Sequence, residues 1–353
     1  MATTVLACSL LTNTVLAELP VDNFHYSRTL NDSGVAEGTI DLADTNVAKL
    51  GLVRNGIVEP AAIAIYVNRD GSFTWGGALW THSYVGSSSL LSFHALEFGS
   101  LMGYFFYVGG TINTVYEVSV LARKLATDTF AWQGVPLLLA QQSVTPTSYS
   151  LVMNPWEIHF AIELMQTLHT LQGGIDWGFD VTLDNNGNPC AQFSESYPRR
   201  GASYVNSGVV FDYPGTVLDY HLTRDGTKLT GLLVENGAGS GSNMLQAIVG
   251  ATNPGYPYLM AGETNSNISD MNSLTAYANG RLNSARNPVQ TASFSLPASV
   301  FFPSGVTTGD EVQLAINDAY MQGMIPGRII AYDVKTQTAG SPEIVDVTLG
   351  NPL

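Results

Sequence analysis

One tight turn constrains the fold of this chain more than any other stretch. Residues 65–80 read IYVNRDGSFTWGGALW, with Asp70-Gly71 at the centre and apolar residues alternating on both sides. An Asp-Gly pair between such runs is typical of a β-hairpin, because both central residues of its turn need positive φ. The sequence therefore predicts two antiparallel strands here. The two tryptophans, Trp75 and Trp80, and the Gly76-Gly77 pair raise the question of what the hairpin is for.

Short alternating runs divided by turn residues recur through much of the chain. They fill residues 16–97 and resume after residue 200, which predicts an antiparallel β module at each end. We divide the chain into an N-terminal β module (1–110), an α/β module with two helices and a hairpin (111–200), and a C-terminal β module (201–353) containing one helix near 270–284. The predicted class is α+β and β-dominated.

Helical signals mark the middle module. The spacing of Val115, Val118 and Leu121 is helical, and a second helix is predicted at NPWEIHFAIELMQTL. Asn154 is its expected N-cap, with Pro155 at the first helical position and Glu157 in the first turn.

Two further local signals complete the assignment of elements. Asn186-Gly187 suits a hairpin turn that needs positive φ at both central positions. A later helix is expected from Asp270 to about Ser284, with Ser269 as its cap.

The charge balance excludes one class of function. The chain has 14 Lys and Arg against 29 Asp and Glu, a net charge of -15, so it is not built to grip nucleic acid by neutralising phosphates. Cys8 and Cys190 lack metal-type spacing and are expected to be free thiols. No membrane span is predicted, because the most apolar window is interrupted by His94 and Glu97.

No catalytic, cofactor-binding or metal-binding residues can be assigned. The densest acidic set, Asp176, Asp180 and Asp184, has the even spacing that places acids on one face of a strand beside a turn, where they stay hydrated. The helix with His159 and Glu163 lacks the second histidine of a zinc-hydrolase helix. The sequence therefore predicts no enzyme and no cofactor.

The tryptophans of the opening hairpin allow two interpretations. Trp75 and Trp80 are an odd number of residues apart, so in an unbulged strand they point to opposite faces, unlike a platform on which a sugar or base stacks. A bulge at Gly76-Gly77 would re-aim one of them. We favour packing, with one ring in a core and the other covering a second surface or a neighbouring subunit.

Several segments, taken in order, resemble a known family, the minor tail proteins that form the tail-tip hub of long-tailed actinobacterial phages. The matching segments are FHYSRTLNDSGVAEGTIDL, IYVNRDGSFTWGGALW, GFDVTLDNNGN with SYPRRG, VFDYPGTVLDYHLTRDGT with VENGAG, GYPYL, and TTGDEVQLAI. The resemblance spans most of residues 24–350 and supplies no catalytic residues.

The resemblance implies a fold and a place of action. It implies two tail-tube-like β-barrel modules with the α/β module between them, assembled as a homotrimer at the tail tip of the virion. It also implies contacts with other tail proteins: the tail tube or distal tail ring, the tape measure, and tip fibre or spike proteins. The function expected is a structural hub that closes the tail tube and lets genome DNA pass without specific binding. The alternative is a receptor- or carbohydrate-binding tail-tip protein.

Overall fold

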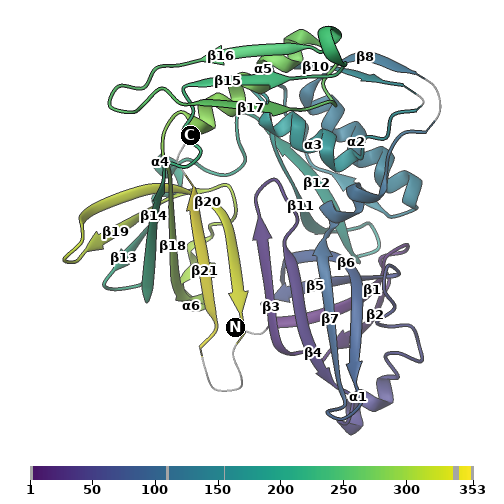
Figure 1. Ribbon diagram of the computed structural model, residues 1–353. Coiled ribbons are helices and arrows are strands. Elements are labelled where there is room, and N and C mark those ends of the chain that lie inside the picture. Colours follow the sequence, from purple (N-terminus) through teal and green to yellow (C-terminus); the bar gives the residue numbers. More distant parts are fainter. Residues whose placement is uncertain (1–2, 109–110, 155, 337–341, 351–353) are drawn as a thin grey trace.

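A computed structural model describes residues 3–108, 111–154, 156–336 and 342–350. Its main element is a 13-stranded sheet that contains strands from both ends of the chain (Figure 1). The strand order is β14 (Asp219–Asp225), β18 (Val289–Pro297), β21 (Ile344–Gly350), β20 (Gln322–Lys335), β3 (Asp22–Thr29), β4 (Val35–Asp41), β7 (Leu90–Glu97), β6 (Ser72–Val85), β5 (Ile63–Arg69), β1 (Thr3–Ser9) and β2 (Val15–Leu19). Off this path, β19 (Glu311–Asn317) pairs with β20 and with β13 (Val210–Tyr213).

Strand β20 joins the two β groups. Its first half pairs with β19, while its second half pairs with β21 on one side and with β3 on the other, from Ala331 opposite Thr29 to Lys335 opposite His25. Within the described residues no strand path closes on itself, so no closed barrel is found there, and the two tail-tube-like β-barrel modules stay a prediction. The fold is β-dominated α+β, as predicted, but a 14-residue strand shared by both groups makes their strands one open sheet.

Three small sheets, the helices and the 3-10 turns form the rest of the molecule. The sheets are β8 (Ile112–Glu117) with β10 (Ser148–Met153); β11 (Asp176–Leu183) with β12 (Pro189–Ser196) and β9 (Leu137–Leu139); and β16 (Gln246–Gly250), β15 (Leu232–Asn236) and β17 (Met260–Thr264). The helices are α1 (Thr45–Leu50), α2 (Val118–Gln133), α3 (Ala161–Thr170), α4 (Tyr204–Ser207), α5 (Met271–Ala285) and α6 (Ala298–Phe301), with 3-10 turns η1 (Phe98–Tyr104), η2 (Gly241–Asn243) and η3 (Phe302–Ser304).

Two hydrophobic clusters lie on opposite faces of the long sheet. Ile65 and Val67 of β5 belong to the first cluster, between the two β groups, whereas Ala64 and Tyr66 belong to the second. The second cluster also contains the buried faces of α2, α3 and α5. Strand β5 is therefore buried on both sides, which explains its nearly continuous apolar sequence.

The domain boundaries stay a prediction, but the packing adds one fact about them. Leu233, Ala247 and Leu274, all from the predicted C-terminal module, lie in the second cluster with the helices of the middle module. The layer of β15, β16, β17 and α5 therefore packs with the α/β part of the molecule (Figure 1).

Several local predictions are confirmed and others need correction. The first hairpin forms as predicted, with φ of 49° at Asp70 and 88° at Gly71. The second also forms, but of its two central residues only Gly187 has positive φ, because the Asp184 side chain accepts bonds from the Asn186 and Asn188 N–H groups in a longer turn.

The predicted helix starts were too early. Residues 112–117 form β8, paired with β10, so α2 begins only at Val118. Asn154 does not cap α3: Glu157 folds back onto the Asn154 backbone N–H at 2.8 Å, and the helix begins at Ala161. Pro155 lies outside the described residues. Helix α5 is capped by Asp270, whose carboxylate accepts the Ser273 N–H, and not by Ser269.

Candidate functional site: a buried ionic junction

Strand β11 meets both β groups of the long sheet at a cluster of ion pairs, here called the junction. It consists of Arg28, Glu97, Asp176, Asp180, Arg200 and Arg328. These residues come from β3, β7, β11, the segment after β12, and β20. The junction therefore connects the α/β part to both β groups.

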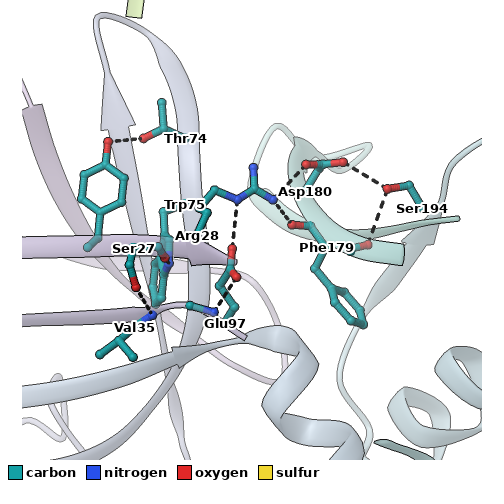
Figure 2. A network of polar contacts seen from close by, with 12 residues as sticks. Ser27, Arg28, Val35, Thr74, Trp75, Glu97, Phe179, Asp180 and Ser194 are labelled. Carbon is teal, nitrogen blue, oxygen red and sulfur yellow. Dashed lines mark hydrogen bonds and ion pairs between the residues drawn. The ribbon is translucent and has the colours of Figure 1, made fainter. Parts of the chain in front are cut away.

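Arg28 connects the N-terminal strands to β11. Its Nε donates to Glu97 at 3.0 Å, and its Nη2 donates to the Phe179 carbonyl at 2.7 Å and to Asp180 at 3.1 Å (Figure 2). Glu97 also accepts the Gly34 N–H at 2.7 Å. Burial opposes the charge on Arg28, but the carboxylates of Glu97 and Asp180 hold its pKa above the ordinary value.

Asp176 is the most fully satisfied acid of the junction. It is 3% exposed, forms an ion pair with Arg328, and accepts hydrogen bonds from Asn31 Nδ2 at 2.7 Å and from the Arg200 N–H at 2.8 Å. Burial would raise the pKa of Asp176, but the Arg328 charge and these bonds lower it. Asp176 is therefore held as a carboxylate inside the protein.

Asp180 lies four residues along the same strand and binds two cations. It pairs with Arg200 and Arg28, and it accepts the Ser194 hydroxyl at 3.2 Å (Figure 2). These arginines lower its pKa against the effect of burial. Asp176 is buried, so the expectation that it stays hydrated is wrong. The Asp180 side chain is 35% exposed and keeps partial contact with solvent, and Asp184 lies in the hairpin turn.

The junction has the chemistry of a structural lock. Arginines and backbone N–H groups bind its carboxylates, which suits a structural role. Burial raises the pKa of Glu97 against the opposing charge of Arg28, whereas the pKa values of Asp176 and Asp180 are lowered. Across the described segments, no group of three or more His, Cys, Asp or Glu side chains is arranged to hold a metal ion. None of the described helices combines the length and the apolar character that a membrane crossing requires.

The two tryptophans of the opening hairpin lie in different environments. Trp75 is 1% exposed in the first cluster and donates from its indole to the Ser27 carbonyl at 3.0 Å, next to Arg28 (Figure 2). Trp80 packs partly against the second cluster, stacks on Tyr104 at 4.7 Å between ring centroids, and donates to Ser100.

Strand β6 has two bulges, and neither is at the glycine pair. Against β5, Val67 pairs with Trp75 and Asn68 with Phe73, so one bulge falls on Thr74. Against β7, Leu79 pairs with Ala95 and Thr81 with His94, so the other bulge falls on Trp80 itself. The glycines permit close packing: a Cβ on Gly76 would lie 2.6 Å from the Val181 side chain on β11. The hairpin is thus a packing element between the sheet and β11.

Sequence reasoning missed the junction because its members are far apart in the chain. Arg28 and Arg328 lie about 150 residues before and after their partners on β11, and no local sequence pattern indicates these contacts. A usable signal was the placement of two acids four residues apart on a strand that also contains Trp177 and Phe179, both buried. Acids on such a buried strand need cations.

Comparisons with known proteins give a fold but no sequence family. No family model matches the chain, and no curated protein is similar enough in sequence to match. The fold is similar to that of the tail protein from Neisseria meningitidis MC58, with TM-score 0.62, 11% identity, and coverage of 99% of this chain and 97% of that chain. It is also similar to the 43 kDa tail protein of prophage MuSo2 from Shewanella oneidensis, with TM-score 0.61, 11% identity, and coverage of 98% of this chain and 98% of that chain. A third similar structure is prophage tail protein gp18 from Listeria monocytogenes EGD-e, with TM-score 0.55, 12% identity, and coverage of 99% of this chain and 94% of that chain.

Proposed function

We propose that this chain is a structural protein of a phage tail tip, a homotrimeric hub that closes the end of the tail tube and provides the axial passage for genome delivery. The observation that carries the proposal is the likeness to three tail proteins along nearly the whole length of both chains. Because the match includes the β groups and the α/β part together, it concerns the complete architecture and not one common module.

The solvent-facing side of the long sheet is our candidate for the wall of that passage. This polar face lies opposite the first cluster and runs from β14 to β7. Directly opposed residues form two rows across it. One is Asp219, Ser295, Asp346, Asp333 and Ser27; the other is Lys335, His25, Glu37, His94 and Thr81.

The charges of the polar face suit a surface that DNA passes without adhering. Its rows carry four carboxylates and one lysine, Lys335, which is engaged by Asp346 at 2.6 Å and Asp333 at 3.6 Å. A wall of this kind gains little by displacing the counterions of phosphate groups. With a net charge of -15 per chain, a trimer would carry about -45, three times the single-chain value, and would repel DNA further.

The proposal places the protein in the virion, at the tail tip, in contact with other tail proteins. It assigns no catalytic step, in keeping with a junction whose acids are all paired. Trp75 and Trp80 are proposed as packing or interface aromatics, not as a sugar platform.

Imaging of the tail tip of assembled particles tests the proposal. We expect threefold order with the polar face turned toward the axis. We also expect purified protein to bind duplex DNA no more tightly than the roughly 10⁻⁴ to 10⁻⁶ M of non-specific contact at physiological salt. A peripheral monomer with an outward aromatic cleft would favour the receptor-binding alternative, and tight salt-sensitive DNA binding would contradict the assignment of the wall.

A further inference from the structure

The β15–β17 layer exposes large apolar side chains on the side away from α5. Ile248 and Met260 are 60% and 70% exposed, and Leu232 and Val234 lie between them. The register puts all four on one side, because Val234 is opposite Ile248 and Leu232 is opposite Met260. With Tyr258, which is 53% exposed, these residues form what we call the apolar face.

The strands of the apolar face place no charged side chain on it, and Arg286 lies at its edge, beside Tyr258. Between Lys228 and Thr264 the sequence has two charged residues, Glu235 and Glu263, and they are opposite each other in the parallel register. Glu235 is 1% exposed, and Glu263 is bound by Arg281 of α5. Both carboxylates therefore lie on the other side of the layer, toward the helix.

The two glycines of the apolar face differ in what lies over them. A Cβ on Gly262 would meet nothing nearer than the Val234 carbonyl oxygen at 3.8 Å, so the strand has open space there. The Tyr258 hydroxyl lies over Gly250, where a Cβ would be 2.7 Å from it. A sheet surface with exposed Ile and Met and no charged side chain on its own strands is of the kind that marks a protein contact.

We infer that the apolar face is a subunit contact, occupied by a second copy of this chain. Each copy carries a net charge of -15, so two copies repel one another wherever their charged surfaces approach. The strands of the apolar face add no acid to that repulsion, which favours this face over the acidic surfaces for contact with a second copy. A basic partner would instead favour the acidic surfaces.

The inference rests on the proposed homotrimer and identifies one surface that would hold it together. In a ring the contact is heterologous, so the apolar face of each copy is seated against a different surface of the next. Burying Ile248 and Met260 there removes apolar area from water, which is the main driving force of such contacts.

The test compares two double variants of the full chain with the wild type. Ile248→Lys with Met260→Lys places charge on the apolar face. The matched control, Val205→Lys with Met324→Lys, alters two apolar residues that are 88% and 58% exposed in other parts of the chain. Circular dichroism checks folding, and native mass spectrometry and sedimentation velocity measure association over a range of concentrations.

We expect the wild type and the control to associate alike, and the apolar-face variant to stay folded while associating at least about tenfold more weakly. If the folded variant associates as tightly as the wild type, the inference is overturned and the proposed trimer stands. If the wild type is monomeric at every concentration and also in assembled particles, both fail. If only the control weakens, the subunit contact lies elsewhere and the inference is again overturned.

Discussion

Asp176 in the junction and Glu235 under α5 are buried to the same degree, with 3% and 1% of their surfaces exposed, yet their surroundings differ completely. Asp176 has Arg328, Asn31 and a backbone N–H as partners. Neither carboxylate oxygen of Glu235 has a hydrogen-bond partner among the described residues, since Arg281 is bound to Glu263.

The difference decides the protonation of each acid. Arg328 keeps Asp176 ionised by lowering its pKa, whereas burial raises the pKa of Glu235, with only partial opposition from Arg281. The junction therefore holds a charge that stabilises the fold, and the β15–β17 layer holds an acid whose charged form burial penalises. The two regions should respond oppositely to pH and to removal of charge.

Removing Arg328 should have the largest effect. Arg328→Met leaves Asp176 as a buried charge without its cation and also removes the donors to the Gly309 and Arg200 carbonyls. We expect a loss of about 3–5 kcal/mol in the free energy of unfolding, measured by urea denaturation.

A matched control and a double variant sharpen that test. Lys335→Met breaks ion pairs at a lysine that is 52% exposed and should cost about 1 kcal/mol or less. Arg328→Met combined with Asp176→Asn should cost less than the sum of the single changes, because no charge is left unpaired. Additive costs would show that the two residues do not act as a pair.

Truncating Trp75 separates packing from charge beside the junction. Trp75→Ala removes a ring that is 1% exposed and leaves the Ser27 carbonyl without its donor, so we expect a loss of about 3 kcal/mol or more. Trp132→Ala is the control: its ring is 72% exposed, and its loss should change unfolding by about 0.5 kcal/mol or less. Equal costs would contradict the placement of Trp75 in the core.

Acid should weaken the junction selectively. The pKa values of Asp176 and Asp180 are lowered in the folded protein, so their stabilisation is present above the ordinary value of about 4 and is lost as pH falls through the folded values. Urea midpoints between about pH 5 and pH 3 should fall more steeply for the wild type than for Arg328→Met, which has already lost the pair. Parallel curves would place the acid response elsewhere in the molecule.

The sequence predicted the parts of this fold that depend on neighbouring residues. The Asp70-Gly71 turn was predictable because its φ angles are imposed by two residues. The pairing of β20 with β3 was not predictable. It places Lys335 opposite His25, and no local sequence pattern specifies a pairing between residues so far apart in the chain. The two tail-tube-like β-barrel modules were expected from the resemblance alone, and no local pattern indicated the strand that the two β groups share.

The candidate site was harder to predict for the same reason. The even spacing of Asp176 and Asp180 was visible, but their hydration was inferred from the nearby turn, whereas Arg28, Arg200 and Arg328 reach them from three other segments. The burial of Glu235 could not be predicted from its neighbours Val234 and Asn236. Helix α5, which covers it, begins some 40 residues later in the chain.

Glu235→Gln should have the smallest effect and the opposite pH signature. Because the folded pKa of Glu235 is raised, its protonated form stabilises the layer below the ordinary pKa of about 4.5, and this contribution is lost as pH rises through the folded value. Glutamine keeps the shape and stays neutral, so the variant should match the wild type near pH 4 and be slightly more stable, by about 1 kcal/mol, at pH 7 to 8. Glu59→Gln is the control, since it removes an exposed acid far from the β15–β17 layer in the chain. Urea midpoints across this pH range measure both. A Glu235→Gln variant that loses stability at pH 7 would mean that the carboxylate is ionised and bound there, and the contrast with Asp176 would disappear.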